Sequence, residues 1–344
     1  MQEISSKTQM EKIRRFEKGF MATHLIRLGA KVGIFEKLNE KKEQGLSVPE
    51  LAQALELHEP YLKLWCQTAF HFEILDCDSD GNFKLQPFLD EILGDKSHFR
   101  NYLPNIAVDV DLVGKGMTEA ATYFKTGRTV EAFSDPAVSK AACETTRNIY
   151  LAFVFLIFPK NEHLKLQLEQ GIDYLDIGCG NGTLITQFAA AFPKSRFVGV
   201  GTDPHGIEDA RAAIAQSRLQ DRVSVEHVGG EAIAYTEKFD MVSMVVTLHE
   251  IRPDVRGAVV EKAYRALKPG GSILILDFPY PDAVADFRNP IYDYGIMDQF
   301  YETFMGSVHL TSVEQTQLLA RAGFKDIRRM AVGKGMFDFI TASR

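Results

Sequence analysis

Apolar residues follow a helical spacing at the start of the chain. Over residues 10–38 they recur at steps of three and four, and glycines interrupt the pattern near Gly29–Gly33. This spacing predicts a helix, broken at the glycines, with a wide apolar face. An apolar face this wide must be buried, either against a partner subunit or against another part of the same chain. The pattern does not distinguish the two.

A compact unit is predicted next, over residues 46–85. Ser47 precedes Pro49 and Glu50, the arrangement of a capping box at the start of a helix. A more apolar helix follows in EPYLKLWCQTAFHFEIL, and LDCDSDGNFKL predicts two short strands around a turn at Asp80-Gly81. Helix, helix and β-hairpin in this order are typical of a winged helix.

The charge distribution argues against a role for this unit in DNA binding. Its second helix offers only Lys63 as a cation, whereas a helix that reads DNA normally carries several Arg, Lys, Asn or Gln side chains. The chain has 39 Lys and Arg against 46 Asp and Glu, a net charge of −7. Nothing in this balance attracts nucleic acid or an anionic membrane. We expect a structural or dimerisation role instead.

Other features of the sequence favour a soluble, cytoplasmic protein without a membrane partner. The opening MQEISSKTQMEKIRRFEKGF has no apolar core of signal-peptide length. The longest apolar run, Leu151 to Pro159, is about half of what spans a bilayer. The cysteines form no CxxC pair, which fits a reducing compartment; they are Cys66, Cys77, Cys143 and Cys179.

Residues 86–165 are predicted to be helical and irregular. Residues 124–128 read as a loop, and residues 148–158, NIYLAFVFLIF, as a very apolar helix. We expect this stretch to link two domains and to cover the active site, although no chemistry can be read from it alone.

After Gly171 short apolar runs alternate with amphipathic helical segments. Fully apolar strands in such an alternation predict a doubly wound, mostly parallel α/β sheet covered on both faces. The strands are predicted at 174–178, 196–201, 223–228, 241–248, 272–278, 326–331 and 336–341, and the helices at 184–192, 207–219, 255–271 and 313–324. The predicted domains are therefore 1–100, helical and winged-helix; 101–165, linker and cover; and 166–344, the sheet.

A glycine-rich turn follows the first strand of this sheet. The strand ends at Asp176, and residues 178–182 read G-C-G-N-G before a helix. Glycines let the backbone approach a ligand closely at the sheet edge where ligands bind in such folds. The spacing differs from the G-x-G-x-x-G of dinucleotide sites. A tight strand-to-helix turn without a ligand is the alternative.

Residues 171–344 resemble the class I S-adenosylmethionine-dependent methyltransferases. LDIGCGNG is similar to that family's first motif, KFDMVSMVVTLHEI and RALKPGGSILILDF to its fourth- and fifth-strand segments, and LLARAGF to the helix before its sixth strand. With the N-terminal unit, essentially the whole chain resembles the small-molecule O-methyltransferase subfamily. The resemblance implies a Rossmann-like methyltransferase sheet, S-adenosylmethionine as cofactor and a homodimer formed through the N-terminal domain.

The resemblance also implies roles for particular residues at the cofactor. Glycines of the turn would approach it, Asp176 would orient the loop, Glu231 would accept from the adenine amine, and two residues after the fourth strand would border the methyl donor. The cofactor-binding residues predicted in this way are Asp176, Gly178, Gly180, Gly182, Asp203, Glu231, Thr247 and Leu248.

One position departs from the family. Where a carboxylate usually ends the second strand and takes the ribose hydroxyls, this chain has Gly201, and the next carboxylate is Asp203. Either Asp203 reaches the ribose through a shifted loop or the ribose is held differently. Asp203 is equally explained as a turn residue before Pro204.

The catalytic group is harder to assign. Relatives place a histidine after the fifth strand, but YDYGIMDQFYETFMG contains none. The candidates are His249, Glu250 and His309. A histidine could deprotonate a phenol or enol, His249 could ligate a divalent ion beside Glu250, or the pair could form a structural hydrogen bond. We assign no metal ligands.

The segment after the fifth strand should line the substrate pocket, because it follows the ligand-binding edge of the sheet. Its candidate substrate residues are Tyr292, Tyr294, Asp298, Tyr301 and Glu302, and the alternative is that this aromatic-rich helix is core. The sequence thus predicts methyl transfer to a hydroxyl, or an acidic carbon, of a small aromatic or enolic metabolite. The rivals are a cofactor-binding homologue with other chemistry and a winged-helix DNA-binding regulator.

Overall fold

The computed structural model describes residues 4–130 and 135–344. By their internal contacts these residues form two compact units, Met1–Thr118 and Glu119–Arg344. The sequence had suggested three segments with boundaries after 100 and 165. The roles expected for those segments, as dimerisation domain, cover and cofactor domain, stay predictions.

The first unit begins with two helices that the glycines separate. Helix α1 spans Ser6–Lys31 and α2 spans Ile34–Glu40. Gly33 between them has φ of +77°, a left-handed conformation that glycine adopts without steric cost. The break predicted near Gly29–Gly33 is confirmed.

A helix pair and a β-hairpin follow, as expected. Helix α3 spans Val48–Leu55 behind the predicted capping box, in which Ser47 and Glu50 each bond the other's backbone, and α4 spans Glu59–His71. Strands β1 (Leu75–Cys77) and β2 (Phe83–Leu85) pair antiparallel. The order of elements is confirmed, and their assignment as a winged-helix domain stays a prediction.

The apolar face of α1 is open to solvent along much of its length. Trp65 of α4 packs beside Gly29 and donates from its indole to the Leu25 carbonyl at 3.0 Å, which fixes the C-terminal end of α1 in the unit's core. Further toward the N-terminus, large apolar side chains are more than half exposed; they are Met10, Ile13, Phe16, Phe20 and Met21.

The middle of the chain is helical and irregular, as predicted. Two of them, α5 (Leu103–Ala107) and α6 (Gly114–Met117), belong to the first unit. The second unit continues with α7 (Ala120–Thr126), α8 (Pro136–Ala152) and α9 (Glu162–Gln170). The loop predicted at 124–128 is wrong in part, because α7 continues to Thr126 and stops only where Gly127 takes φ of +65°.

One helical stretch of the described chain, Pro136–Lys160, is long and apolar enough to cross a membrane by length and composition. The core helix of a soluble protein passes the same test, so a single stretch of this kind is weak evidence for a membrane span. Its residues Phe153 and Phe158 are fully buried against the central sheet's core.

The second unit is built on a seven-stranded sheet with the order β5-β4-β3-β6-β7-β9-β8. All pairs among β5, β4, β3, β6 and β7 are parallel, and β9 runs antiparallel to β7 and β8. The strands are β3 (Asp173–Ile177), β4 (Arg196–Gly201), β5 (Val223–His227), β6 (Phe239–Val245), β7 (Leu267–Asp277), β8 (Lys325–Val332) and β9 (Phe337–Ser343). The predicted mostly parallel sheet is confirmed.

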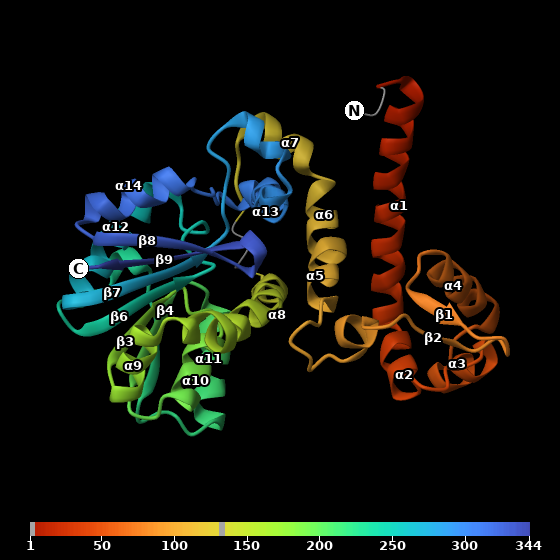
Figure 1. The fold of residues 1–344 in the computed structure, drawn as a ribbon, viewed down its shortest axis with the longest axis horizontal. Coiled ribbons are helices and arrows are strands. Elements are labelled where there is room, and N and C mark those ends of the chain that lie inside the picture. Colours follow the sequence, from red (N-terminus) through yellow and green to blue (C-terminus); the bar gives the residue numbers. More distant parts are fainter. Residues whose placement is uncertain (1–3, 131–134) are drawn as a thin grey trace. The chain divides into compact units, whose positions relative to one another are not determined.

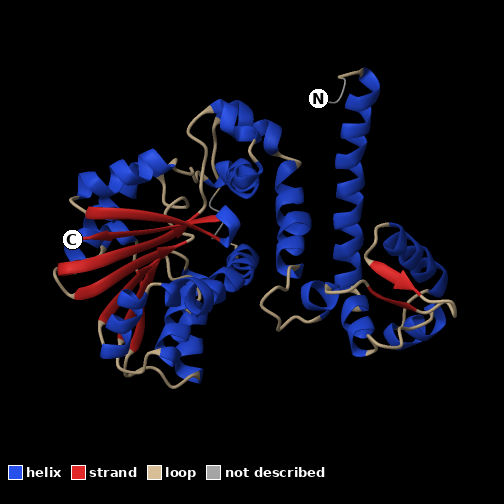
Figure 2. Cartoon of the chain, viewed as in Figure 1, coloured by secondary structure: helices blue, strands red, loops and turns tan. Residues whose placement is uncertain are grey.

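Helices cover both faces of this sheet (Figures 1 and 2). Alternate residues of a strand face opposite sides, so Tyr174 packs under α9, α10 and α11 while Leu175 packs under α12 and α14. The remaining helices are α10 (Thr183–Ala191), α11 (Pro204–Gln216), α12 (Pro253–Ala266), α13 (Asp293–Glu302) and α14 (Ser312–Ala322). Two apolar cores therefore pack against the sheet, one on each face.

The sequence placed the end of one helix too late. The pattern predicted a helix over 255–271, but α12 ends at Ala266 and β7 begins at Leu267. Pro269 disfavours a helical conformation for Lys268 before it. The chain therefore turns into the strand earlier than the apolar periodicity suggested.

Candidate functional site

The glycine turn lies where the strand order of the sheet reverses. It leaves β3, which has β4 on one side and β6 on the other, and such a switch point opens a crevice at the carboxyl edge of a parallel sheet. Gly178, Gly180 and Gly182 have φ of +82°, +48° and +72°. A Cβ on Gly178 would lie 2.3 Å from Cγ2 of Thr247, so only glycine fits there.

A cavity of about 100 Å³ opens beside this turn. The glycine turn, the loop after β4 and the loop after β6 form one side, and α8 forms the other. The lining residues are Ala142, Cys143, Thr146, Tyr150, Gly178, Gly180, Gly201, Thr202, Asp203, Ile207, Val246, Thr247 and Glu250. Of the predicted cofactor residues, this cavity brings together Gly178, Gly180, Asp203 and Thr247.

Asp203 combines the two roles that the sequence left open. It is the N-cap of α11, where its Oδ1 accepts from the backbone N of His205 at 3.0 Å, and it also lines the cavity. Its Oδ2 accepts from the hydroxyl of Ser139 on α8 at 2.5 Å. A carboxylate therefore does stand next to Gly201, held by two hydrogen bonds.

Asp176 lies beneath the turn rather than in the cavity lining. It is 2% exposed, and Oγ of Ser243 on β6 donates to it at 2.6 Å. Burial raises the pKa of its carboxyl to about 7, against the opposing effect of the Ser243 hydrogen bond. Its contact joins β3 to β6 below the glycine turn.

Three other predicted cofactor residues do not line this cavity. Gly182 is the left-handed residue that begins α10. Glu231 is exposed in the short helix Gly230–Ala232 after β5. Leu248 is fully buried in the core that packs under α12, because consecutive residues of this turn point in different directions.

His249 follows the strained turn that ends β6. Val246 has φ of +53°, which a β-branched residue adopts only under constraint. His249 is 2% exposed, its Nδ1 lies 2.5 Å from Oδ1 of Asp277, and its backbone N donates to Oδ2 of Asp277 at 3.1 Å. Burial lowers the pKa of His249, but the carboxylates of Asp277 and Glu302 outweigh it and hold that pKa well above its ordinary value.

His309 lies against His249 although the two are 60 positions apart in the sequence. The rings stack with centroids 4.4 Å apart and an interplanar angle of 21°. The buried guanidinium of Arg256 joins the two segments, since its Nη2 donates to the carbonyls of His249 and Val308 at 2.9 and 2.7 Å. Gln299 accepts from the backbone N of His309.

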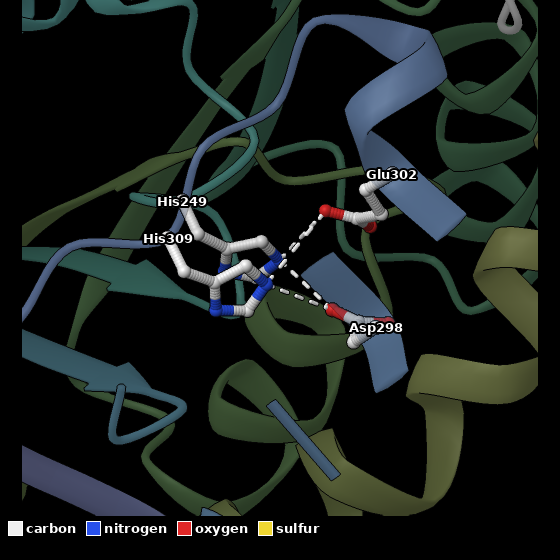
Figure 3. Close-up of side chains that lie close together, drawn as sticks. All are labelled: His249, Asp298, Glu302 and His309. Atoms are coloured by element: carbon white, nitrogen blue, oxygen red, sulfur yellow. Dashed lines mark hydrogen bonds and ion pairs between the residues drawn. The ribbon is translucent and has the colours of Figure 1, made fainter. Parts of the chain in front are cut away.

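Two carboxylates of α13 face these rings (Figure 3). Asp298 and Glu302 are four residues apart, so they lie on the same face of the helix. His309 Nε2 lies 3.1 Å from Oδ2 of Asp298, and His249 Nε2 lies 3.6 Å from Oε2 of Glu302. Burial raises the pKa of Glu302 well above its ordinary value. We call His249, Asp298, Glu302 and His309 the histidine–carboxylate cluster.

Glu250 is not part of this cluster. It lines the cavity instead, and burial raises its pKa to about 7. The carboxylates that meet His249 are therefore those of α13 and Asp277, not the neighbouring Glu250 that the sequence suggested.

The other candidate substrate residues have different surroundings. The ring of Tyr294 packs on Phe278 with centroids 4.8 Å apart and borders the core, which agrees with the core alternative. Tyr292 and Tyr301 are half-buried at the start and near the end of α13. Sequence reasoning missed Asp277 and Ser139, and it gave Asp298 and Glu302 no partner; only the i, i+4 spacing on a helix hinted at a shared target.

The strand order and the glycine turn identify the fold. This is the fold of the class I S-adenosylmethionine-dependent methyltransferases. Residues 175–273 match a family described as "Methyltransferase domain". Human N-acetylserotonin methyltransferase, solved with S-adenosylmethionine, covers 100% of this chain and 99% of its own with TM-score 0.78 at 15% identity. PigF, solved with S-adenosylhomocysteine, covers 99% and 100% with TM-score 0.80 at 14% identity.

Curated methyltransferases match part of the chain. The 27-O-demethylrifamycin SV methyltransferase of Amycolatopsis mediterranei is 33% identical over 114 residues, which cover 33% of this chain and 41% of the relative. The ubiquinone biosynthesis O-methyltransferase of Psychrobacter cryohalolentis is 33% identical over 103 residues, 29% of this chain and 38% of the relative. The chain thus matches about two fifths of these relatives' length.

S-adenosylmethionine, the cofactor predicted from the sequence, is the cofactor of this methyltransferase fold, and the residues present fit it. The backbone of the turn can approach a ligand because no Cβ projects from Gly178 or Gly180. Asp203 and Glu250 offer carboxylate oxygens to hydroxyl and ammonium groups, and both line the cavity.

Proposed function

We propose that this chain transfers the methyl group of S-adenosylmethionine to a hydroxyl, or to an acidic carbon, of a small aromatic or enolic metabolite. The observation that carries the proposal is the double role of residues 247–250. Thr247 and Glu250 line the cavity beside the glycine turn, and His249 between them enters the histidine–carboxylate cluster. A cofactor site and a group of buried polar side chains thus share one turn of chain.

The sulfonium of the cofactor supplies an activated methyl group. The acceptor oxygen or carbon forms the new bond to that methyl while the bond to sulfur breaks and its electron pair stays on sulfur. The protein's part is to hold the acceptor in line and to take up or disperse its proton. The candidate residues for that part remain His249, Glu250 and His309, with α13 as one wall of the acceptor site.

The cavity is small compared with pockets that enclose a whole cofactor. Its volume of about 100 Å³ is below the ~300 Å³ at which ligand pockets begin. Helix α8 touches the site through the Ser139–Asp203 bond and through Cys143, which lies near Gly180. We expect α8 to move outward when the cofactor enters.

Calorimetry with S-adenosylmethionine and S-adenosylhomocysteine, followed by mass spectrometry of phenolic and enolic acceptors, tests the proposal. We expect binding of both cofactor forms and a product one methyl group heavier than its acceptor. Absence of binding at millimolar cofactor would sink the proposal. Binding without transfer to any acceptor would favour a homologue with other chemistry.

We also propose that the chain forms a homodimer through the exposed apolar residues of α1, in the cytoplasm. Exposed aromatic side chains such as Phe16 and Phe20 lose contact with water when a second copy covers them, and this lowers the free energy of the dimer. Sedimentation should give twice the chain mass for the wild type and the monomer mass for the double variant Phe16→Ser, Phe20→Ser. The matched variant Glu11→Ser, at an exposed position on the other side of the same helix, should remain a dimer.

A further inference from the structure

Four potential ligand atoms converge in the histidine–carboxylate cluster. Nε2 of His249, Nε2 of His309, Oδ2 of Asp298 and Oε2 of Glu302 all lie within 4.8 Å of one another. The separations from imidazole to carboxylate are 3.1, 3.6, 3.9 and 4.0 Å. Ligands bound about 2.0–2.2 Å from one ion stand about 3–4 Å from each other.

An unsatisfied atom points into this group. Glu302 is 6% exposed, and its Oε2 has no hydrogen-bond partner among the described residues. A buried carboxylate oxygen without a partner costs free energy. An ion at the centre of the cluster would remove that cost.

The surroundings of His249 are those of a metal ligand. Metal-bound histidines usually present their second ring nitrogen to a carboxylate, which fixes the ring's orientation. Asp277 takes this position, with Oδ1 2.5 Å from Nδ1 of His249, and leaves Nε2 directed into the cluster (Figure 3). His309 is held differently, through its backbone bond to Gln299 and its stacking on His249.

We propose that His249, His309, Asp298 and Glu302 bind one divalent transition-metal ion. Two imidazole nitrogens and two carboxylate oxygens suit first-row ions such as Fe²⁺, Mn²⁺, Co²⁺ and Zn²⁺. The two carboxylates balance the charge of the ion, which lowers the cost of burying it. Four protein ligands leave positions free in a six-coordinate ion, so an oxygen of another molecule can join.

The position of the site suggests what that oxygen is. Thr247 and Glu250 line the cofactor cavity within two residues of His249. An ion bound here would hold the acceptor's hydroxyl or enol oxygen beside the methyl donor and favour its deprotonated form. This last step rests on the proposed methyl transfer, whereas the metal site itself does not.

Cobalt binding tests the site directly. The protein is freed of metal with a chelator, dialysed and titrated with Co²⁺, and d–d absorption and metal content are measured, with Zn²⁺ as competitor. We expect about one ion per chain in the wild type. The isosteric variant Glu302→Gln and the variant His309→Ala should lose at least about 100-fold in affinity, and Asp277→Asn about 10- to 100-fold. His163→Ala, which removes an exposed histidine of α9, should bind as the wild type does.

The proposal fails if the wild type gives no cobalt spectrum, or if Glu302→Gln binds Co²⁺ as tightly as the wild type while its near-ultraviolet circular dichroism is native. Weak binding of several ions that these substitutions leave unchanged also overturns it. Methyl transfer by metal-free protein, with no ion bound on titration, would refute the metal site alone. A bound ion without methyl transfer would support the metal site and count against the proposed function.

Discussion

The glycine turn and the histidine–carboxylate cluster share the segment 247–250 but are encoded in different ways. The turn is continuous in sequence, its glycines occupy left-handed conformations, and Gly178 lies against the side chain of Thr247. The cluster joins the end of β6, α13 and the loop before α14. The comparison shows that a continuous motif such as the glycine turn can be recognised from the sequence. The histidine–carboxylate cluster can be recognised only from the structure, because its residues come from distant segments.

The largest effect is expected from Gly178→Ala. The new Cβ would lie 2.3 Å from Thr247 at a φ that alanine avoids, so we expect a loss of stability on the order of 3 kcal/mol and loss of cofactor binding. Urea unfolding and calorimetry measure both. Gly257→Ala on α12, where a Cβ meets nothing within 4 Å, should be neutral or stabilising by up to about 1 kcal/mol. Equal losses in the two variants would contradict a tight turn.

His249→Gln tests whether the histidine–carboxylate cluster serves turnover rather than cofactor binding. Glutamine is polar, uncharged and close to histidine in size, so we expect a folded protein whose turnover falls about 100- to 10,000-fold. Its affinity for S-adenosylmethionine should stay within a few-fold of the wild type, because the cluster does not line the cofactor cavity. His163→Gln is the control. Should cofactor affinity fall as much as turnover, the two regions act as one.

Asp203→Asn tests whether the carboxylate of Asp203, two residues after the end of β4, binds the cofactor. Asparagine caps a helix as well as aspartate does, so α11 should persist. Loss of a charged hydrogen bond to the ribose should raise the dissociation constant of S-adenosylmethionine about 10- to 100-fold, measured by calorimetry. Asp209→Asn, exposed on the same helix, should bind normally. Unchanged binding by Asp203→Asn would leave Asp203 as a cap only.

The smallest effect is expected for a purely local feature, the capping box of α3. Ser47→Ala removes the side-chain acceptor for Glu50 N and should cost about 1 kcal/mol, seen in urea unfolding. Cofactor affinity should not change. A loss of cofactor binding would show that the first unit is coupled to the cavity more tightly than a local feature implies.

The accuracy with which the sequence predicts the bounds of the elements differs from one element to another. The strands at 196–201 and 223–228 were located almost to the residue, since their apolar runs are short and bounded by turns. The end of α12 was missed because its periodicity continues past Ala266, and Pro269 decides the boundary. Leu248 was assigned to the donor site from its place in the sequence, but the turn buries it in the core.

The candidate site was predictable only in part. His249 and His309 were both singled out as histidines near the expected active edge, but nothing in the sequence indicated that they stack. Their contact depends on Arg256, which bonds the carbonyls of His249 and Val308. A buried guanidinium acting on backbone carbonyls leaves no pattern in the sequence.

The sequence by itself determined the sheet, its two helical layers and the glycine turn, because these follow from the spacing of apolar residues and from glycine's access to positive φ. The tertiary structure decided the rest. It brought Ser139 within hydrogen-bond distance of Asp203, placed Glu250 at the cavity and His249 in the cluster, and brought Asp298 and Glu302 to the histidines. These contacts join residues many positions apart, and packing of the helices on the sheet sets their distances.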